Sequence, residues 1–387
     1  MTGHIVADGK SKWKIIIEAG KDPATGKRKR IIRRVTGRKQ DAEAIMVQIL
    51  SELRQGSYVE PNRTTVGAWL NTWLNDYKRI DLRQTTWESY ECMARNHIIP
   101  AVGALVLQEL RPEHLQKLYS DKLKEGKSSR TVRYIHQVIH GALDQAILNK
   151  LISGNNVAKL TILPPLDQKE IRVLTPEEQN IFIKHVINHR MGTAFLVLLG
   201  TGIRRGEMLG LRWKDVDLES GIMHVRQGIV SVKGGLKVHD PKTKTSKRSF
   251  SIPSVLIAML EKHKSAMQGK GFYGPDRYVF CSTKGSATRP RGFNTTFDSI
   301  LDKLGIKDVN LHSLRHTFAT RMLEEGENLK VLQELLGHAK LSITADTYSH
   351  VSPDLKQKAA NRMDGILLGN IGTADQDGTK TAPVPEK

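Results

Sequence analysis

Cysteine and long apolar runs are both scarce in this sequence. The two cysteines, Cys92 and Cys281, lie far apart and form no CxxC pair, which argues against a disulfide framework or a zinc knuckle and favours a reducing, cytoplasmic setting. The apolar segment 194–199 (AFLVLL) is much too short to cross a membrane. Residues 1–20 contain several lysines and lack the apolar core of a signal peptide. No membrane partner is therefore expected.

Acidic residues are scarce as well. The 387 residues include 60 Lys or Arg against 40 Asp or Glu, a formal net charge of +20, which favours nucleic acid over an anionic membrane surface as partner. The excess is uneven, because residues 1–40 alone hold twelve basic and three acidic residues. The sequence also has no acidic cluster with metal-ligand spacing and no Walker A glycine loop. Its length indicates two to three domains.

The first sixty residues predict a small α+β domain. Residues 11–18 and 28–35 are typical of strands, and the Pro- and Gly-containing segment between them is typical of a turn. Residues 39–54 have the periodicity of an amphipathic helix. We expect a domain over 1–60 that is a β-hairpin, or a three-stranded sheet, packed on one helix. Its basic strands indicate DNA binding, through the major groove or through phosphates, with a merely solvated basic face as the alternative.

The next segment predicts an all-α domain over residues 64–160. Residues 65–78 are amphipathic, with aromatic residues at spacings of four that we expect to pack in a core rather than stack on bases. Further helices are predicted over 85–97, after Pro112 and over 128–149. The prolines in the stretch 161–166 then mark a boundary.

Residues 170–366 predict a mainly α-helical domain with a small antiparallel sheet. A capping box at Thr175–Glu178 begins a helix. Later come three predicted strands, 221–227, 228–239 and 247–253, and then helices near 253–265, 292–304, 311–326 and 329–338. The loop 240–247 between the last two strands reads as a flexible, cationic hairpin turn. A short helix is expected over 351–363, and the polar tail 370–387 is predicted to be disordered.

Two basic motifs in this last domain can carry chemistry. Arg204 follows a glycine turn at a helix start, where a guanidinium can reach a phosphate, although Arg204 with Glu207 by itself is more often an exposed salt bridge. Further on, His312 and Arg315 share a helical face. With Tyr348 beyond them, the segment is either a phosphate clamp with a tyrosine nucleophile or an ordinary basic helix.

Three longer motifs carry a family resemblance. They are TGIRRGEMLGLRW at 201–213, HSLRHTFAT at 312–320 and LLGHAKLSITADTYSHV at 335–351. In this order and spacing the chain resembles the tyrosine recombinases, specifically phage and conjugative-transposon integrases of Gram-positive hosts. The resemblance extends over nearly the whole length. It implies that the N-terminal domain binds arm-type DNA sites, the helical domain binds core-type sites and the last domain is catalytic.

The resemblance also implies a set of site residues. The family's active site of arginine, lysine, histidine, arginine, histidine and tyrosine falls on Arg204, Lys242, His312, Arg315, His338 and Tyr348, with Glu207 as a supporting carboxylate. Lys244 is the alternative to Lys242, because both lie on the same loop. His312 and His316 are four apart like a zinc motif, but the glutamate of that motif is missing, so no metal is expected.

These residue types suit attack on a phosphodiester. Two arginines can hold the non-bridging oxygens through paired hydrogen bonds. A tyrosine hydroxyl, with a reference pKa of about 10, needs a base, which we assign to His312. His338 is expected to donate to a phosphate oxygen, and Lys242 to protonate the leaving 5′ oxygen.

The implied function is site-specific DNA recombination that integrates, and also excises, a mobile element or prophage. The expected intermediate is a 3′-phosphotyrosyl bond within a homotetramer on attachment-site DNA, with strand exchange through a four-way junction and no cofactor, metal or ATP. An excisionase or directionality factor and a DNA-bending protein are the expected accessory partners. A topoisomerase of the same chemistry and a DNA-binding regulator on a decayed recombinase scaffold are the alternatives.

Overall fold

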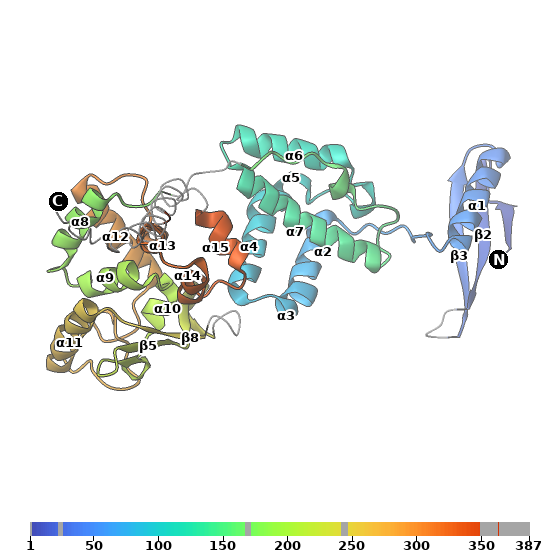
Figure 1. Ribbon diagram of the computed structural model, residues 1–387. Helices are drawn as coiled ribbons and strands as arrows, with labels where there is room; N and C mark the ends of the chain where they lie inside the picture. The colour runs from blue at the N-terminus through green and yellow to red at the C-terminus, as the bar shows by residue number, and fades with distance from the viewer. Residues whose placement is uncertain (1, 22–25, 167–171, 241–246, 349–362, 364–387) are drawn as a thin grey trace, which may run out of the picture. The chain divides into compact units, whose positions relative to one another are not determined.

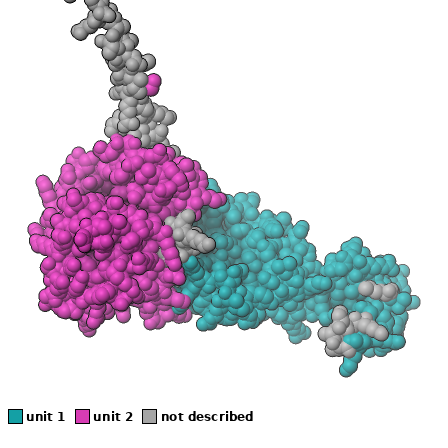
Figure 2. Space-filling model, turned by 60° about the horizontal axis from the view of Figure 1, so that its bottom comes forward, with its two compact units in different colours: residues 1–168 teal, residues 169–387 magenta. Residues whose placement is uncertain are grey.

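The computed structural model divides into two compact units, residues 1–168 and residues 169–387 (Figures 1 and 2). The structure describes residues 2–21, 26–166, 172–240, 247–348 and 363. Among these described residues, no helix is long and apolar enough to cross a membrane. The predicted helix 351–363, apart from Met363, and the predicted disordered tail 370–387 lie outside the described residues.

The first unit begins with a three-stranded antiparallel sheet and one helix. In chain order these are β1 (Gly3–Ala7), β2 (Lys12–Lys21), β3 (Arg28–Thr36) and α1 (Lys39–Arg54), with the sheet ordered β1-β2-β3. Side chains alternate across the strands, so Ile15 and Ile17 of β2 are buried on the same face, together with Ile49 of α1. This is the predicted sheet and helix, with β1 as the third strand.

The opposite face of the sheet is basic and solvent-accessible. Lys14 on β2 stands directly across from Arg34 on β3. Two residues further along the same face, Ile16 stands across from Ile32, whose exposed fraction is 52%. Like charges opposite each other on two strands are destabilising. Arg34 is also ion-paired with Asp8 at 3.0 Å, which balances part of the charge at this position.

The remainder of the first unit is helical, as predicted. Its elements are α2 (Val66–Thr72), η1 (Trp73–Lys78), α3 (Arg79–Asp81), α4 (Gln84–Met93), η2 (Ala94–Ile98), α5 (Ile99–Val102), η3 (Leu107–Glu109), α6 (Pro112–Lys124), α7 (Ser129–Leu148) and η4 (Val157–Leu160). Trp69 and Trp73 are buried in the core, and the Trp69 indole donates to the Ala142 carbonyl of α7 at 2.8 Å. The prediction that these aromatic residues form core is confirmed for both tryptophans.

The second unit is mainly helical with two small antiparallel sheets. Its elements are α8 (Pro176–Val186), α9 (Gly192–Thr201), α10 (Arg205–Gly210), η5 (Trp213–Asp215), β4 (Val216–Asp217), β5 (Ile222–Val225), β6 (Gly228–Val232), β7 (Gly235–His239), β8 (Arg248–Ser251), α11 (Ser254–Gly269), α12 (Pro290–Leu304), α13 (Leu311–Glu324), α14 (Leu329–Leu336) and α15 (Leu341–Tyr348). One sheet is ordered β4-β5-β8, and β6 pairs with β7.

Helix α9 is the centre of this unit. It is apolar on all sides and almost entirely buried, which is typical of a helix enclosed by others, and it packs against α8, α10, α11 and α13. Phe195 on α9 lies 4.7 Å, between ring centroids, from Phe293 on α12. Because α9 is held so firmly, the turn after it is placed rigidly at the edge of the core.

The strand prediction for residues 228–239 is wrong. The segment forms two strands, β6 and β7, that pair antiparallel across a two-residue loop, Lys233-Gly234. Gly234 has a φ of +95°, a conformation that glycine adopts without the cost borne by other residues. Strands β7 and β8 belong to different sheets. The described strands on either side of the predicted 240–247 loop therefore do not pair with each other, and residues 241–246 of that loop lie outside the described residues.

Candidate active site

The turn between α9 and α10 places Arg204 at the start of a helix. Gly202 ends α9 with a φ of +62°, and a Cβ atom there would meet the Phe318 ring at 2.5 Å, so only glycine fits. Arg204 is the N-cap residue of α10. Its backbone N–H donates to the Glu207 carboxylate at 3.2 Å, and its guanidinium Nη1 donates to the other carboxylate oxygen at 3.0 Å. The helix cap thereby sets the direction of the Arg204 side chain.

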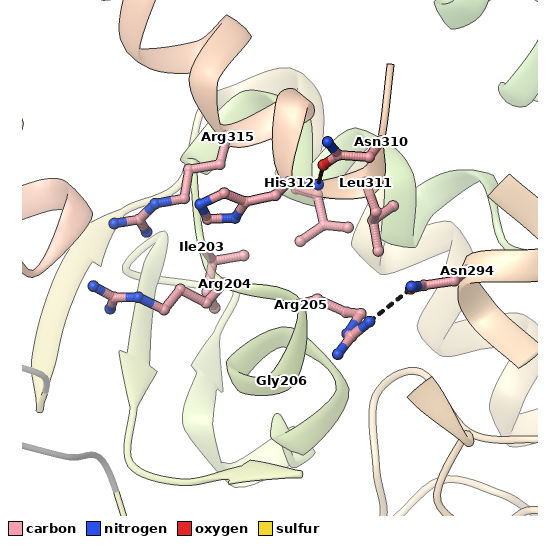
Figure 3. A pocket seen from close by; sticks show the side chains of 10 residues that line it. Ile203, Arg204, Arg205, Gly206, Asn294, Asn310, Leu311, His312 and Arg315 are labelled. Atoms are coloured by element: carbon pink, nitrogen blue, oxygen red, sulfur yellow. Dashed lines mark hydrogen bonds between the residues drawn. The ribbon is translucent and has the colours of Figure 1, made fainter. Parts of the chain in front are cut away.

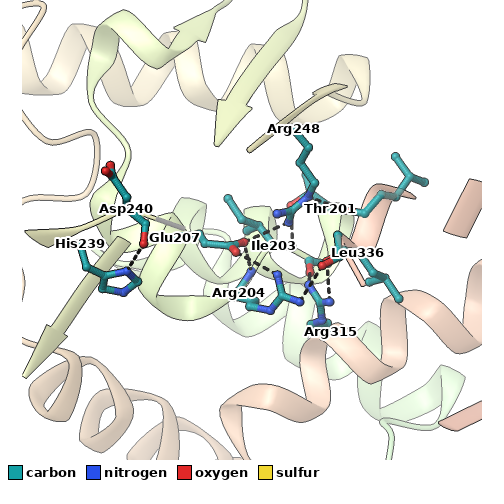
Figure 4. Close-up of polar contacts among 12 residues, drawn as sticks. Thr201, Ile203, Arg204, Glu207, His239, Asp240, Arg248, Arg315 and Leu336 are labelled. Carbon is teal, nitrogen blue, oxygen red and sulfur yellow. Dashed lines mark hydrogen bonds and ion pairs between the residues drawn. The ribbon is translucent and has the colours of Figure 1, made fainter. Parts of the chain in front are cut away.

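Glu207 is a buried anion shared by two arginines. It pairs with Arg204 and, at 3.0 Å, with Arg248 at the start of β8 (Figure 4). Burial by itself would raise the pKa of Glu207, but Arg248 and Arg204 outweigh it and hold that pKa below its ordinary value. Glu207 is therefore ionised at neutral pH and fixes both guanidinium groups.

The C-terminal end of α14 holds three arginines at once. The last carbonyl groups of a helix have no partner within it and carry partial negative charge. Here they accept from three guanidinium groups: Leu335 from Arg248 at 2.8 Å, Leu336 from Arg315 at 2.7 Å and Gly337 from Arg204 at 3.0 Å. Gly337 itself has a φ of +63°, and a Cβ atom there would lie 3.0 Å from the Arg248 guanidinium. The C-terminal end of α14 thus binds three arginine side chains that come from separate parts of the chain.

Arg315 on α13 is the most enclosed of the three arginines. Its exposed fraction is 3%, and besides the Leu336 carbonyl it donates to the Gly202 carbonyl at 2.6 Å. Burial, with the charges of Arg204 and Arg248, lowers the pKa of Arg315 to about 9, so the group stays charged at neutral pH. Its position is consequently set before any substrate arrives.

A cavity of about 360 Å³ opens beside these arginines. Its wall includes Arg204, Arg205, His312 and Arg315, as Figure 3 shows. Burial, followed by Arg315, Arg204 and Arg205, lowers the pKa of His312. His312 is therefore neutral at pH 7, and a neutral imidazole can accept a proton. The cavity combines fixed positive charge with a base.

His338 lies just beyond the end of α14. Its Nδ1 is 2.9 Å from the Thr344 hydroxyl of α15. Burial, together with Arg315 and Arg204, lowers the pKa of His338 to about 4. The side chain is neutral at pH 7, and in the tautomer whose Nδ1 accepts from Thr344 the Nε2–H can donate to an anion.

Tyr348 at the end of α15 is a buried phenol. Its exposed fraction is 3%, and its hydroxyl lies 2.9 Å from Nδ1 of His316 on α13. The ring of His316 is 4.7 Å from that of His312, between centroids. Burial raises the pKa of Tyr348 to about 12, against the opposing charge of Arg315. The phenol is thus protonated at all ordinary pH values and needs a base to become a nucleophile.

The structure brings most of the residues named from the sequence into one region of the second unit. Arg204 and Glu207 come from α10 and its cap, His312 and Arg315 from α13, His338 from the turn after α14, and Tyr348 from α15. Lys242 and Lys244 lie outside the described residues. The described residues contain no group of three or more His, Cys, Asp or Glu side chains that could hold a metal ion.

Sequence reasoning missed two residues of this region. Arg248 precedes Phe250 and Ile252 at spacings of two, and both of these are buried. That alternation assigns Arg248 to the core face of its strand, a signal the sequence did contain. His316 is four residues after His312, but nothing in the sequence connects it to a tyrosine 32 residues away.

Comparisons with known proteins identify the family of this chain. The family model described as the phage integrase family matches residues 166–354, and the phage integrase N-terminal SAM-like domain matches residues 65–123. The tyrosine recombinase XerC-like protein of Caldanaerobacter subterraneus subsp. tengcongensis is 30% identical over 94% of this chain and 99% of its own length. The ICEBs1 integrase of Bacillus subtilis is 25% identical over 92% of this chain and 98% of its own length.

Solved structures share the fold. The Tn1549 transposon integrase in complex with a circular intermediate DNA has a TM-score of 0.68 at 21% identity, covering 78% of this chain and 99% of that chain. A lambda integrase dimer bound to a COC′ core site has a TM-score of 0.58 at 18% identity, covering 89% and 93%. The predicted fold class, multidomain and mostly helical with small antiparallel sheets, is confirmed. The chain belongs to the phage integrase family and is a tyrosine recombinase.

Proposed function

We propose that this chain is the integrase of a mobile DNA element or prophage and that it integrates and excises the element at specific attachment sites. The observation that carries the proposal is the cavity in which Arg204, Arg315 and His312 meet, with Tyr348 on a neighbouring helix. The positively charged side chains of this cavity are held in place by Glu207 and by carbonyl groups at helix ends, and not by solvent. Such preorganised donors favour a reaction in which negative charge develops on a phosphate.

The proposed reaction begins with the Tyr348 hydroxyl. Its oxygen attacks the scissile phosphorus as His312 accepts the phenolic proton, and the bond to the 5′ oxygen breaks. Arg204 and Arg315 hold the non-bridging oxygens, and His338 donates a third hydrogen bond. Lys242 protonates the leaving 5′ oxygen. The resulting 3′-phosphotyrosyl bond keeps the energy of the original phosphodiester, so a 5′ hydroxyl of another strand can reverse the step without ATP.

Tyr348 moves to the phosphate from its contact with His316 in this proposal. The Tyr348 hydroxyl is hydrogen-bonded to His316, whereas the cavity is lined by His312 and not by His316. The bond to His316 therefore describes a resting position of the nucleophile. Catalytic hydrogen bonds are often incomplete before substrate binds.

DNA is the proposed partner of both units. The excess of positive charge, and the like-charged pair of Lys14 and Arg34 on the outer face of the N-terminal sheet, support contact with a polyanion there. Residues 1–60 are proposed to bind arm-type sites and residues 64–160 core-type sites. A homotetramer on DNA, a directionality factor and a DNA-bending protein complete the proposal. Among structures with a related fold is a lambda integrase tetramer bound to a Holliday junction.

Covalent capture tests the proposal directly. Wild-type protein and the Tyr348→Phe variant are each incubated with sheared, nicked genomic DNA of the source organism, and protein–DNA adducts are isolated under denaturing conditions. Wild type is expected to form a 3′-linked adduct whose peptide contains Tyr348, at sites that share one sequence, and the variant is expected to form none. An adduct with Tyr348→Phe would contradict the assignment of the nucleophile. Adducts without shared sequence, with relaxation of any supercoiled plasmid, would indicate a topoisomerase instead.

A further inference from the structure

Arg205 lies beside the proposed catalytic arginine and lines the same cavity. Arg204 and Arg315 extend their guanidinium groups to one side of His312, whereas Arg205 extends toward Asn294 of α12 on the other side (Figure 3). Its guanidinium Nη1 donates to the Asn294 side-chain oxygen at 2.8 Å. The cavity therefore has a second cationic wall that the proposed chemistry does not use.

The partners of Arg205 differ from those of the other arginines in the region. Arg204 and Arg248 share the Glu207 carboxylate, and Arg315 is enclosed by carbonyl groups. Arg205 is exposed, and no ion pair joins it to an acid among the described residues. A guanidinium has five N–H donors, so a single neutral amide leaves most of the group available. Its charge is open to an anion that enters the cavity.

The Asn294 amide orients this charge without neutralising it. An aspartate at that position would form an ion pair with Arg205, but asparagine accepts a hydrogen bond and adds no charge. The charge of Arg205 acts inside the cavity, since it contributes, after burial, Arg315 and Arg204, to lowering the pKa of His312. Arg205 is therefore held in position like the other arginines of the site. Unlike Arg204 and Arg248, it is paired with no carboxylate in the described part of the chain.

We propose that Arg205 and Asn294 form a second anion subsite, which binds the phosphodiester adjacent to the scissile phosphate on the cleaved strand. This inference rests on the proposed function, because it takes the cavity to hold a DNA strand. Successive phosphates follow each other along a strand at about 3.4 Å of rise, so a strand held at Arg204 and Arg315 presents its next phosphate to the adjoining wall. The subsite fixes the register of the strand relative to Tyr348.

Single neutral phosphates test the subsite. The probe is the duplex recovered by covalent capture, prepared as a series in which one phosphate flanking the cleavage site on the cleaved strand is an uncharged methylphosphonate. Adduct formation is timed for wild type, Arg205→Gln, Arg205→Lys and Asn294→Asp. Arg190→Gln serves as the matched control, because Arg190 is an exposed cation in the turn between α8 and α9 and does not line the cavity. Thermal unfolding of each variant verifies that it is folded.

For wild type, one flanking position is expected to lower the rate about 10- to 100-fold, the range typical of losing a hydrogen-bonded charge. Arg205→Gln is expected to show that loss on the unmodified duplex, with little further loss from the neutral phosphate at that position, because both changes remove one interaction. Asn294→Asp is expected to be nearly as slow, since its carboxylate neutralises Arg205, and Arg205→Lys is expected to retain part of the rate. Arg190→Gln is expected to behave as wild type.

Two results would overturn the subsite. One is full additivity of Arg205→Gln with every neutral phosphate. The other is a loss in Arg205→Gln that depends on the identity of the neighbouring base, which would indicate base readout. In both cases wild type still forms its adduct, so the proposed function stands. If wild type forms no adduct on any duplex, the proposed function fails and the subsite fails with it.

Discussion

The N-terminal sheet and the arginine cluster of the second unit use the same kind of side chain in opposite ways. On the sheet, Arg34 pairs with Asp8 at 3.0 Å while three quarters of its side chain is exposed. In the cluster, Arg315 is 3% exposed and donates to two carbonyl groups. Exposed ion pairs contribute little to stability and are screened by salt. A buried guanidinium, in contrast, is destabilising as soon as one of its hydrogen-bond or charge partners is removed. Basic residues on the sheet should therefore be replaceable one at a time, and those of the cluster should not.

The largest effect is expected for Arg315→Lys. Lysine keeps the charge but cannot hold two carbonyls and a phosphate in one plane. Single-turnover adduct formation on the captured duplex should slow by about 10²- to 10³-fold, the cost of losing one preorganised donor. A rate within tenfold of wild type would mean that charge alone suffices and would weaken the contrast between the two regions.

Glu207→Gln should be the most damaging change to stability. It leaves Arg204 and Arg248 without their buried counter-charge, and breaking such a pair typically costs about 3–5 kcal/mol. Urea denaturation measures the change in the free energy of unfolding. Glu219→Gln, an exposed carboxylate in the turn between β4 and β5, is the matched control and should stay within about 0.5 kcal/mol of wild type. Equal losses for both variants would contradict the role given to Glu207.

Substitution of His312 should slow adduct formation much more than substitution of His316, the other histidine of α13. His312 lines the cavity and His316 does not, so His312→Asn should slow adduct formation by about 10²- to 10⁴-fold, as expected for a general base. His316→Asn removes the resting contact of Tyr348 and should change the rate by less than about tenfold, since one hydrogen bond is worth about 1 kcal/mol. The reverse order would assign the base to His316.

The pH profile should reflect the lowered pKa values of His312 and His338, which keep both side chains neutral at pH 7. The pKa of His312 lies below its usual value and that of His338 is about 4, so both bind a proton only at a lower pH than an ordinary histidine. Adduct formation should therefore decline only at a pH lower than that of an ordinary histidine. The unfolded chain binds more protons in that range, so stability also falls as the pH drops from about 6.5 toward 4. A rate of adduct formation that falls to half near pH 6.5 would contradict the lowered pKa values of these histidines.

The smallest effect is expected on the sheet. Lys14→Gln removes a positive charge directly across from Arg34 on the neighbouring strand and should stabilise the free protein by about 0.2–1 kcal/mol. It should also lower the slope of DNA affinity against salt by about one. Filter binding over a salt series and denaturation measure the two quantities. A loss of stability, or an unchanged slope, would show that this face serves only the sheet.

The sequence named many of the residues that the structure brings together in the candidate site, because several signals are local. The helix and capping patterns around Glu207 and the spacing of His312 and Arg315 depend on residues within one turn of each other. Lysine placement on the 240–247 loop was less determined, because nothing in a polar segment distinguishes Lys242 from Lys244. The single strand predicted over 228–239 was wrong because a glycine turn divides it.

The sequence by itself determined which side chains this protein has available for the proposed phosphate chemistry, through the motifs at 201–213, 312–320 and 335–351. Only the tertiary structure decided how they are held. The end of α14 receives arginines from three distant segments, Arg248 joins through Glu207, and Tyr348 rests on His316. Those partners are separated by 21 to 133 residues. Periodicity in the sequence indicates only which face of a helix or strand a residue occupies. The residues that contact that face are decided by how whole helices pack against one another.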